Sequence, residues 1–495
     1  MRAVSGAAVR MTEIRPMPSG ERASEPDLAG LASDSREVKP GYLFAALSGS
    51  RADGGAFLAD AVTRGASTVL GAPSLREQVE RLGVRFIADF NPRRRLAEIA
   101  AAYFGAQPRT IAAITGTNGK TSVSVFLRQI WQSEGRNAAS LGTIGLVTKE
   151  GVEALRHTTP DAITLHRLLA ELAREGVSHL ALEASSHGLD QYRLDGARIA
   201  AAGFTNITRD HLDYHKDFAH YLAAKLRLFE LVEPGGVAAV NADAPHAEEF
   251  VRLARERNLK PVTVGLFGET LRLLSRTPQG EGQTLEIALG GAVHRIALPL
   301  VGDFQAANAL LAAGMAIGLG DDPERVLAAL SHLQGAPGRL EKVAWARSGA
   351  PIYVDYAHTP DALETVLTAL RPHVQGGLHL VFGCGGDRDR GKRPLMGEIA
   401  ARGAQNVIVT DDNPRTENPA EIRREILAGC PDAREIGDRA EAIRNAVAML
   451  APDDALVIAG KGHEPGQIVG DTVRPFLDRN EAEKAALANG GRVVS

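Results

Sequence analysis

This chain of 495 residues has few cysteines, little net charge and no long apolar runs, and each of these features excludes a class of protein. The two cysteines, Cys384 and Cys430, have neither metal-ligand nor redox spacing, so a disulfide framework is excluded and a reducing compartment is expected. The formal net charge of −4 provides no basic field for nucleic acid, so any anionic ligand needs a local site. No stretch reaches the roughly 18 uninterrupted apolar residues of a membrane helix, so we expect no membrane span.

Residues 1–20 contain three arginines and several small residues, but no apolar segment of the kind found in a secretory signal. We interpret them as a frayed extension, with Met11 as an alternative start, and we expect a cytoplasmic protein.

Apolar runs alternate with amphipathic stretches along the chain, which is the rhythm of a parallel sheet covered by helices. At about 100–200 residues per domain, the length predicts three domains. A proline at position 108 disfavours helix in the residue before it, so we expect a linker there. The prediction is an α/β protein with domains at residues 1–107, 108–338 and 339–495.

The apolar runs predict strands at residues 42–47, 67–70, 110–115, 180–183, 203–208, 236–241, 351–356, 379–383, 406–410 and 455–459. Helical periodicity is expected at residues 57–64, 120–131 and 306–318. Residues 271–298 alternate apolar and polar side chains between glycine turns, as in antiparallel strands. Each of the last four strands precedes a polar or glycine-rich turn and then a helical pattern.

A glycine turn between a strand and a helix is the most informative motif. Residues 115–121 read Thr-Gly-Thr-Asn-Gly-Lys-Thr, and the two glycines let backbone N–H groups approach phosphate oxygens. Lys120 can face the β- and γ-phosphates, Thr121 can hold Mg²⁺, and the helix N-terminus adds partial positive charge. Because Ile114 stands where the strict Walker pattern has glycine, the motif is a variant. A plain strand–turn–helix is the alternative, and the flanking elements favour the nucleotide loop.

Acidic residues and histidines follow two later strands of this segment. Glu183 ends one strand and is either a Mg²⁺ ligand or a solvated loop acid. Residues 206–215 include two aspartates and two histidines, which suit Mg²⁺ beside a phosphate better than zinc, while His215 reads as a structural histidine. Lys225, taken alone, reads as an ordinary lysine with its stem along an apolar helix face.

Polar turns also end the strands of the last segment. Asp355 can bind ribose hydroxyls, although a helix cap at this turn is the alternative role for Thr359 or Asp361. Residues 383–394 place four cations in six residues after a run of glycines, which favours an anion site over a solvated charge run. Acids and an arginine in residues 412–415 and 460–464 suit a zwitterionic substrate.

Taken together, these motifs resemble those of the Mur ligases, and the resemblance covers nearly the whole chain. It rests on residues 34–36 (Asp-Ser-Arg), 115–121, 183–189, 209–215, 225, 355–360, 385–394, 412–415 and 460–464. The resemblance implies a UDP-binding first domain, a central P-loop ATPase-like parallel sheet and a C-terminal Rossmann-like domain that binds an amino acid. It also implies ATP-dependent peptide-bond formation in cell-wall synthesis, Mg²⁺, and a monomer.

The resemblance assigns roles residue by residue. It implies catalytic roles for Lys120, Lys225 and His211, with Lys225 carbamylated. It implies metal binding by Thr121, Glu183, His211 and carbamylated Lys225. It implies ATP binding by Gly116, Thr117, Asn118, Gly119, Lys120, Thr121, Ser122, Asn308, Arg339 and Asp355. It implies UDP-substrate binding by Ser35, Ser50, Arg51, Ala52, Thr158, Thr159, Ser185, Gln191 and Arg193. It implies diaminopimelate binding by Arg388, Asp412, Asn413, Pro414, Arg415, Gly460 and Glu464.

Residues 412–415 are similar to the diaminopimelate-adding branch of the family, so the expected substrates are UDP-N-acetylmuramoyl-L-alanyl-D-glutamate, meso-2,6-diaminopimelate and ATP. Arg415 would pair with the distal carboxylate, which lysine lacks, and an unpaired site charge rejects the wrong substrate strongly. Gln305 and His157 stand where asparagine is expected, and each affects one hydrogen bond to nucleotide or substrate. Three alternatives are a lysine-adding relative, a folylpolyglutamate synthase-like ligase and a P-loop switch protein without an amino-acid pocket.

Overall fold

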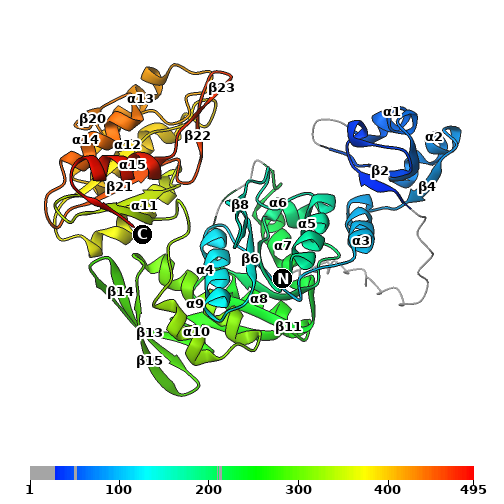
Figure 1. Cartoon of the computed structure of the whole chain (residues 1–495), viewed down its shortest axis with the longest axis horizontal. Coiled ribbons are helices and arrows are strands. Elements are labelled where there is room, and N and C mark those ends of the chain that lie inside the picture. The colour runs from blue at the N-terminus through cyan, green and yellow to red at the C-terminus, as the bar shows by residue number, and fades with distance from the viewer. Residues whose placement is uncertain (1–27, 50–52, 209, 211–213, 495) are drawn as a thin grey trace, which may run out of the picture. The chain divides into compact units, whose positions relative to one another are not determined.

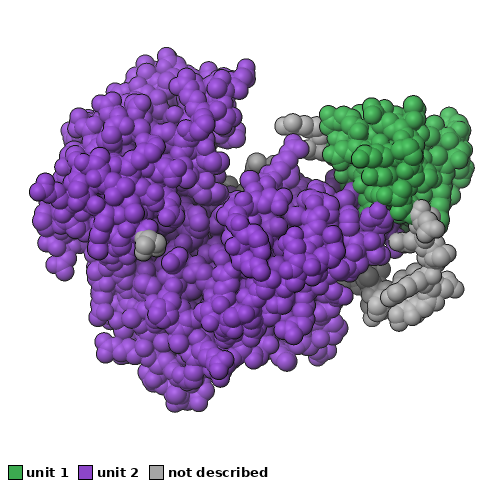
Figure 2. Space-filling view, viewed as in Figure 1, with its two compact units in different colours: residues 1–92 green, residues 93–495 purple. Residues whose placement is uncertain are grey.

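The computed structural model describes residues 28–49, 53–208, 210 and 214–494. These residues form two compact units, residues 1–92 and residues 93–495, which are coloured separately in Figure 2.

The first unit is built on four parallel strands in the order β1-β2-β3-β4. The strands are β1 (Gly30–Ala32), β2 (Tyr42–Ala46), β3 (Ala66–Gly71) and β4 (Arg85–Ala88). Two helices, α1 (Leu58–Thr63) and α2 (Arg76–Arg81), bury apolar side chains against them, and Phe44, Leu58 and Val69 are essentially inaccessible to solvent. The strands expected at 42–47 and 67–70 and the helix expected at 57–64 are confirmed to within one residue at each end.

The second unit begins in α3 (Pro92–Phe104) and contains an eleven-stranded sheet in the order β15-β14-β13-β12-β11-β10-β5-β9-β6-β7-β8 (Figure 1). Its parallel core consists of β5 (Thr110–Thr115), β6 (Ala138–Gly142), β9 (His179–Glu183), β10 (Ile199–Phe204), β11 (Val232–Asn241) and β12 (Lys260–Gly265). The flanking strands are β7 (Gly145–Thr148), β8 (Gly151–Glu153), β13 (Leu271–Gln279), β14 (Gly282–Leu289) and β15 (Ala292–Leu298). The last three form the antiparallel segment expected at 271–298.

Alternate residues of β5 face two separate apolar layers. Ala112 and Ile114 pack with α4 (Lys120–Ser133), α9 (Asp303–Gly318) and α10 (Pro323–Leu330). The intervening residues pack against the helices of the opposite face, chiefly α5 (Ala162–Arg174), α7 (Phe218–Glu230) and α8 (Ala247–Glu256). A strand buried on both faces reads as a continuous apolar run, which is why its position was predictable.

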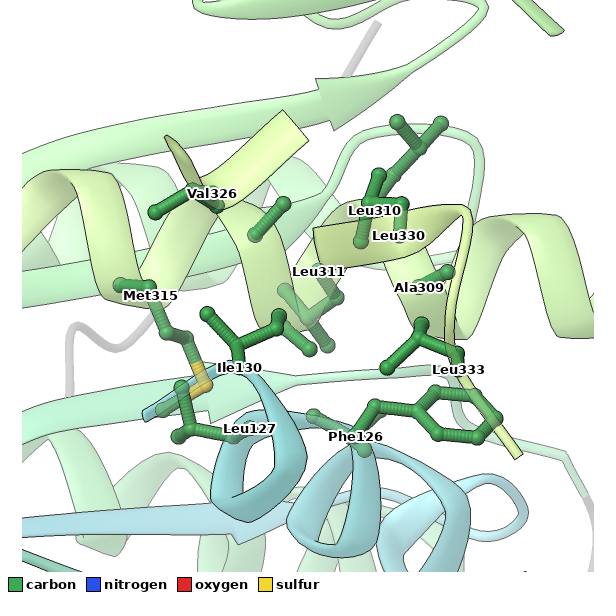
Figure 3. Packing of buried hydrophobic residues seen from close by; sticks show 14 of the residues in the cluster. Phe126, Leu127, Ile130, Ala309, Leu310, Leu311, Met315, Val326, Leu330 and Leu333 are labelled. Carbon is green, nitrogen blue, oxygen red and sulfur yellow. The ribbon is translucent and has the colours of Figure 1, made fainter. Parts of the chain in front are cut away.

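The contact between α4 and α9 forms the centre of the first of these layers. Figure 3 shows Leu127 of α4 next to Met315 of α9 and Ile130 next to Leu311, while the Phe126 ring extends toward Leu333; all five of these α4 and α9 side chains are buried. Alanines along α9 have small side chains, which lets bulky residues of the neighbouring helix fill the space between them.

A second sheet in this unit has seven strands in the order β20-β19-β18-β21-β17-β16-β24. The strands are β16 (Glu341–Trp345), β17 (Pro351–Asp355), β18 (Leu378–Phe382), β19 (Asn406–Val409), β20 (Arg434–Glu435), β21 (Ala455–Ala459) and β24 (Arg492–Val493). Five of them, β17 to β21, run parallel. The covering helices are α11 (Pro360–Leu370), α12 (Lys392–Gly403), α13 (Pro419–Leu427), α14 (Arg439–Ala448) and α15 (Asp478–Ala488).

Two expectations about chain path are wrong. The strand expected at 203–208 ends at Phe204, because the next residues leave the sheet to bind the phosphate loop, with the Thr117 N–H donating to the Asn206 carbonyl at 2.8 Å. The turn after β21 leads into a hairpin, β22 (Gly466–Val469) and β23 (Thr472–Pro475), before helix α15 begins. The helix cap at residue 359 is confirmed, because the Thr359 hydroxyl accepts the Ala362 N–H.

Within the described part of the chain, no helix combines the length and apolarity needed to cross a membrane.

Replacing Leu311 with alanine should lower the free energy of unfolding by about 2–5 kcal/mol, because the substitution removes buried methyl groups and leaves a cavity between α4 and α9. Urea unfolding followed by circular dichroism measures this. Leu274→Ala is the matched control, since Leu274 is 46% exposed and its loss should change stability by less than about 0.5 kcal/mol. Equal losses in the two variants would contradict the packing described.

Candidate functional site

The phosphate loop joins the end of β5 to the start of α4. A Cβ on Gly116 would lie 1.8 Å from the Thr205 Oγ1, and one on Gly119 would lie 2.4 Å from the Asn308 Oδ1, so only glycine fits at either position. Both glycines also have positive φ, 150° and 87°. The Lys120 Nζ donates to the Gly116 and Thr117 carbonyls, both at 2.8 Å, so the ammonium lies over the turn.

The chain after β10 holds this loop in place. The Asn118 N–H donates to the Asn206 Oδ1 at 3.0 Å, and the Thr205 Oγ1 donates to the Asn118 carbonyl at 2.5 Å. Ser122, the third residue of α4, is buried. The turn is therefore fixed from two sides, as expected of a loop whose backbone N–H groups must bind a ligand without rearranging.

The Glu183 carboxylate lies at the carboxyl end of β9, next to β5 in the sheet, and is 1% exposed. Its Oε2 accepts from the Thr121 Oγ1 and the Thr143 Oγ1, both at 3.1 Å, and its Oε1 accepts from the Thr143 N–H at 2.8 Å. The solvated-acid alternative is wrong, because this carboxylate is buried and held by three donors. Carboxylate and hydroxyl oxygens beside a phosphate loop form a donor set suited to Mg²⁺.

Lys225 is buried on α7, so the reading of it as an ordinary surface lysine is wrong. Its Nζ donates to the Gly116 carbonyl at 2.7 Å and lies 4.4 Å from the centre of the Tyr221 ring. Burial lowers the pKa of Lys225 well below its usual value, and the neighbouring Lys120 charge lowers it further. The Tyr221 hydroxyl lies 3.0 Å from the Thr117 Oγ1, and burial raises the pKa of Tyr221 to about 12.

The five central residues expected to hold the UDP-linked peptide form a connected set beside Glu183. The Thr158 Oγ1 lies 3.1 Å from the Thr143 Oγ1, and the Thr159 Oγ1 donates to the Glu183 carbonyl at 2.8 Å. The Arg193 guanidinium donates to the Thr159 carbonyl at 2.6 Å and to the Gln191 Oε1 at 2.7 Å.

Ser185, the fifth residue of this set, bonds to Thr159 and caps a helix. Its N–H donates to the Thr159 Oγ1 at 3.0 Å, and its own hydroxyl caps the short helix α6 (Ser186–Asp190). Ser35, which the resemblance places near the uridine, belongs to the first unit and is buried in the turn after β1. Ser50, Arg51, Ala52 and His211 lie outside the described residues.

The residues expected near the nucleoside lie where α9 meets the start of the seven-stranded sheet. The Gln305 Nε2 donates to the Arg339 carbonyl at 3.0 Å, and the Gln305 Oε1 accepts from the Asn308 Nδ2 at 3.5 Å. Glutamine at position 305 therefore connects Asn308 on α9 to Arg339, which precedes the seven-stranded sheet. The Arg339 guanidinium lies 4.8 Å from the centre of the Tyr356 ring. Asp355 is buried and accepts the Leu340 N–H at 2.6 Å and the Ala357 N–H at 2.7 Å.

The residues expected to bind diaminopimelate surround the carboxyl ends of β19 and β21. Arg415 has a positive φ of 52°, and its guanidinium donates to the Gly386 carbonyl at 2.8 Å. The Asn413 Nδ2 donates to the Glu464 Oε2 at 2.9 Å. A Cβ on Gly460 would lie 2.8 Å from the Asp412 Oδ2, so the two turns touch through a glycine.

Pro414 packs against the glycine turn after β18, because a Cβ on Gly386 would lie 1.9 Å from the Pro414 carbonyl oxygen.

The four cations of residues 388–393 divide into two kinds. Arg393 is fully buried and forms ion pairs with Glu417 at 2.8 Å and Glu425 at 2.7 Å. Arg390 also pairs with Glu425. Half of the expected anion site is therefore a structural ion-pair network; Arg388 and Lys392, which donate to backbone carbonyls, are the cations in this segment without a carboxylate partner among the described contacts.

The nucleotide side and the amino-acid side meet through His463. A Cβ on Gly338 would lie 2.4 Å from the His463 backbone nitrogen, and the His463 ring lies 5.4 Å from the Tyr356 ring. Burial lowers the pKa of His463, and the Arg339 charge lowers it further. The Arg339 charge also acts on Lys120 and Asp355. The turn at 460–464 thus packs against the segment that contains Arg339, and the Arg339 charge acts on residues of both the nucleotide side and the amino-acid side.

Sequence reasoning missed Thr143 and Lys461. Thr143 carries no charge and no recognisable motif, and its position just after β6 is the single signal that marks it. Lys461 lies inside a motif that was quoted, but nothing in the sequence indicates that its side chain is fully buried.

The fold and the site define a P-loop α/β protein in which a nucleotide loop faces a second, Rossmann-like sheet. Three family models match the chain: the Mur ligase family catalytic domain at residues 27–104, the Mur ligase middle domain at 114–316, and the Mur ligase glutamate ligase domain at 338–462. The chain belongs to the Mur ligase family.

Relatives with high identity carry one name, UDP-N-acetylmuramoyl-L-alanyl-D-glutamate–2,6-diaminopimelate ligase. The protein of that name from Bradyrhizobium diazoefficiens is 55% identical over 96% of this chain and 99% of its own length. The Caulobacter vibrioides protein is 52% identical over 94% and 96%. A solved structure with this name aligns at a TM-score of 0.72 and 36% identity, covering 94% of this chain and 95% of its own.

Folylpolyglutamate synthase of Mycobacterium tuberculosis is also similar in fold, with a TM-score of 0.61 at 20% identity over 78% of this chain. The similarity at this level of identity extends to the fold alone.

Asp355 should make stability depend on pH. Burial raises the pKa of Asp355 from 3.8 to about 6, so the folded state holds a proton that the unfolded state has lost. This contribution is fully present below pH 3.8 and is lost as the pH rises through about 6. Relative to Asp355→Asn, the wild-type protein should lose on the order of 2–3 kcal/mol of unfolding free energy across that window. Urea titrations between these pH values measure it, and parallel curves for the two proteins would contradict the assignment.

Proposed function

We propose that this protein is an ATP-dependent ligase that joins meso-2,6-diaminopimelate to UDP-N-acetylmuramoyl-L-alanyl-D-glutamate in peptidoglycan synthesis. The observation that carries the proposal is the packing of the 460–464 turn against Gly338, where an added Cβ would lie 2.4 Å from the His463 backbone nitrogen, beside the Arg339 segment that Gln305 joins to Asn308 at the phosphate loop. A P-loop alone serves many reactions, whereas a P-loop next to a pocket of fixed charges suits acyl transfer to an amine. The shared name of close relatives supports the same substrates.

The ATP site proposed here uses residues 116–122 for the phosphates, Asn308 and Arg339 near the base, and Asp355 near the ribose. The support is their common location around α4, α9 and the start of the second sheet. Lys120 would leave the Gly116 and Thr117 carbonyls to neutralise the γ-phosphate, since both reactants of the first step are anions.

A Mg²⁺ site fits the oxygen donors that surround Glu183. We propose Glu183, Thr121 and His211 as residues that hold the ion, which when bound would neutralise phosphate charge. Lys225 as an ammonium would repel a cation, but burial lowers its pKa, and the neutral amine is the form that adds carbon dioxide. We therefore propose that Lys225 is carbamylated and that the carbamate joins this site as an anion.

The peptide and amino-acid substrates are assigned to two different sets of residues. We propose that Thr158, Thr159, Ser185, Gln191 and Arg193 bind the muramoyl dipeptide, with Ser35 and residues 50–52 near the uridine. We propose that Arg388, Arg415, Glu464, Gly460 and residues 412–414 bind diaminopimelate, with Arg415 pairing with its distal carboxylate.

Two steps follow from this arrangement. The γ-carboxylate of D-glutamate attacks the γ-phosphate of ATP, which yields an acyl phosphate and ADP. The diaminopimelate amine then attacks the acyl carbon, a tetrahedral intermediate forms, and phosphate leaves. The chain's residues orient the reactants and exclude water, which would otherwise hydrolyse the acyl phosphate.

The ATP and amino-acid residues all belong to the second unit of one chain, and we propose that a monomer in the cytoplasm, where ATP is available, carries out the reaction. The three family models support a division into a UDP-binding domain at 1–107, an ATP-binding domain at 108–338 and an amino-acid-binding domain at 339–495.

ADP release with ATP, Mg²⁺ and the UDP-dipeptide should be fast with meso-diaminopimelate, and kcat/KM should be lower by about 100-fold or more with L-lysine, because lysine leaves the Arg415 charge unpaired. Coupled spectrophotometric assays and mass spectrometry of the product measure this. Equal use of the two amino acids, or ATP hydrolysis that ignores the UDP-dipeptide, would contradict the proposal.

Two variants separate the half-reactions in the same assay. Lys120→Met should abolish phosphate transfer while leaving binding of the UDP-dipeptide intact. Arg415→Ala should raise the KM for diaminopimelate and leave the acyl-phosphate step, trapped with hydroxylamine, unchanged. A normal diaminopimelate KM in Arg415→Ala would overturn the specificity assignment.

A further inference from the structure

We propose that Lys461 is a positioning residue of the amino-acid pocket, which fixes Asn413 and Glu464 in the orientation that receives diaminopimelate. The inference rests on the proposed function and adds a residue to it. Lys461 follows Gly460 at the carboxyl end of β21, and its side chain is fully buried. A buried ammonium is costly unless it is paired and hydrogen-bonded, so its surroundings reveal what it does.

All three hydrogens of the Lys461 ammonium have acceptors within the protein. The Nζ donates to the Asn413 Oδ1 at 3.0 Å, to the Glu464 Oε2 at 3.2 Å and to the Gly466 carbonyl at 2.6 Å. A lysine ammonium has three donors, so none remains for a substrate. Lys461 therefore acts on the substrate through its neighbours.

The contacts of Asn413 fix which way its amide faces. Its Oδ1 accepts from Lys461 and from the Ile468 N–H at 2.9 Å, which uses both lone pairs. Its Nδ2 donates to the Glu464 Oε2 at 2.9 Å. A reversed amide would direct its NH₂ at two donors, so the orientation is determined, and one N–H of Asn413 remains for a carboxylate.

Glu464 is held in the same way. Its Oε2 receives both Lys461 and Asn413, so that oxygen is fully committed, while the side chain remains 33% exposed. The Tyr356 side chain also interacts with this carboxylate, and the other oxygen, Oε1, has two lone pairs, so that it can still accept an ammonium group. Lys461 thus compensates part of the Glu464 charge and fixes the orientation of the carboxylate, and with it the position of Oε1.

The same lysine connects three chain segments into one pocket. Lys461 belongs to the 460–464 turn, Asn413 to the 412–415 turn, and Gly466 to the start of the hairpin β22–β23. The hairpin in turn holds Arg415, whose N–H donates to the Ile468 carbonyl at 3.0 Å and whose carbonyl accepts the Gly470 N–H at 2.7 Å. Loss of the ammonium should therefore disturb the groups that bind both the ammonium and the carboxylate of the substrate.

The test uses Lys461→Met, which keeps the unbranched chain up to the ε position and removes the ammonium group. The KM for meso-diaminopimelate should rise by about 30-fold or more, because Glu464 and Asn413 lose the donor that orients them. The KM for ATP and the yield of hydroxamate, formed from the UDP-dipeptide and ATP with hydroxylamine in place of diaminopimelate, should stay within about threefold of wild type. Lys484→Met, which removes an exposed lysine from α15, is the matched control and should change none of these values.

A double variant keeps the test decisive. In Lys461→Met with Glu464→Gln, the Glu464 charge is already absent, so adding Lys461→Met should raise the diaminopimelate KM much less than it does in the wild-type protein, because only the Asn413 contact remains to be lost. An unchanged KM in Lys461→Met, additive effects in the double variant, or loss of hydroxamate formation in both variants would overturn the inference. A wild-type protein that forms no hydroxamate would instead contradict the proposed function.

Discussion

The buried carboxylate of Glu183 is the interaction on which the nucleotide side of the site depends. It ends a central parallel strand and is bound by donors from the phosphate-loop helix and from the Thr143 turn. Parallel strands present their carboxyl ends at one edge of a sheet, which brings the phosphate loop and this carboxylate together, with Thr158 and Thr159 beside them. A buried carboxylate also needs compensation, which makes the position suited to a cation.

The amino-acid side also contains a buried charge that needs compensation, but there the charge is positive. There a buried cation, Lys461, is compensated by one carboxylate and two neutral oxygens. Arg439 and Asp478 form a second buried pair, and the Arg439 guanidinium also donates to the Ala459 carbonyl at 2.9 Å, immediately before the 460–464 turn. Buried charges at strand ends thus hold the adjacent loops in place. Partly exposed charges, such as that of Glu464, remain accessible to a ligand.

The sequence predicted the strands and the strand-end motifs well, because buried parallel strands are continuous apolar runs and the glycine turn has strict steric demands. It failed where a side chain's role depends on a partner far along the chain. Arg393 reads as part of a basic run, but its partners are Glu417 and Glu425 on a neighbouring segment. Lys225 was placed in the site by family resemblance, since no local pattern distinguishes a buried lysine from one on the surface.

The central claim is that the nucleotide residues around Arg339 and the 460–464 turn act as one site during turnover. A double-mutant cycle on kcat/KM for diaminopimelate, using Tyr356→Leu, His463→Ala and their combination, tests this directly, because the two rings lie 5.4 Å apart and Tyr356 also contacts Arg339. The account predicts a coupling energy above about 0.5 kcal/mol, as found for residues in contact. Strictly additive effects of the two substitutions would mean that the nucleotide and amino-acid sides work independently, and would contradict it.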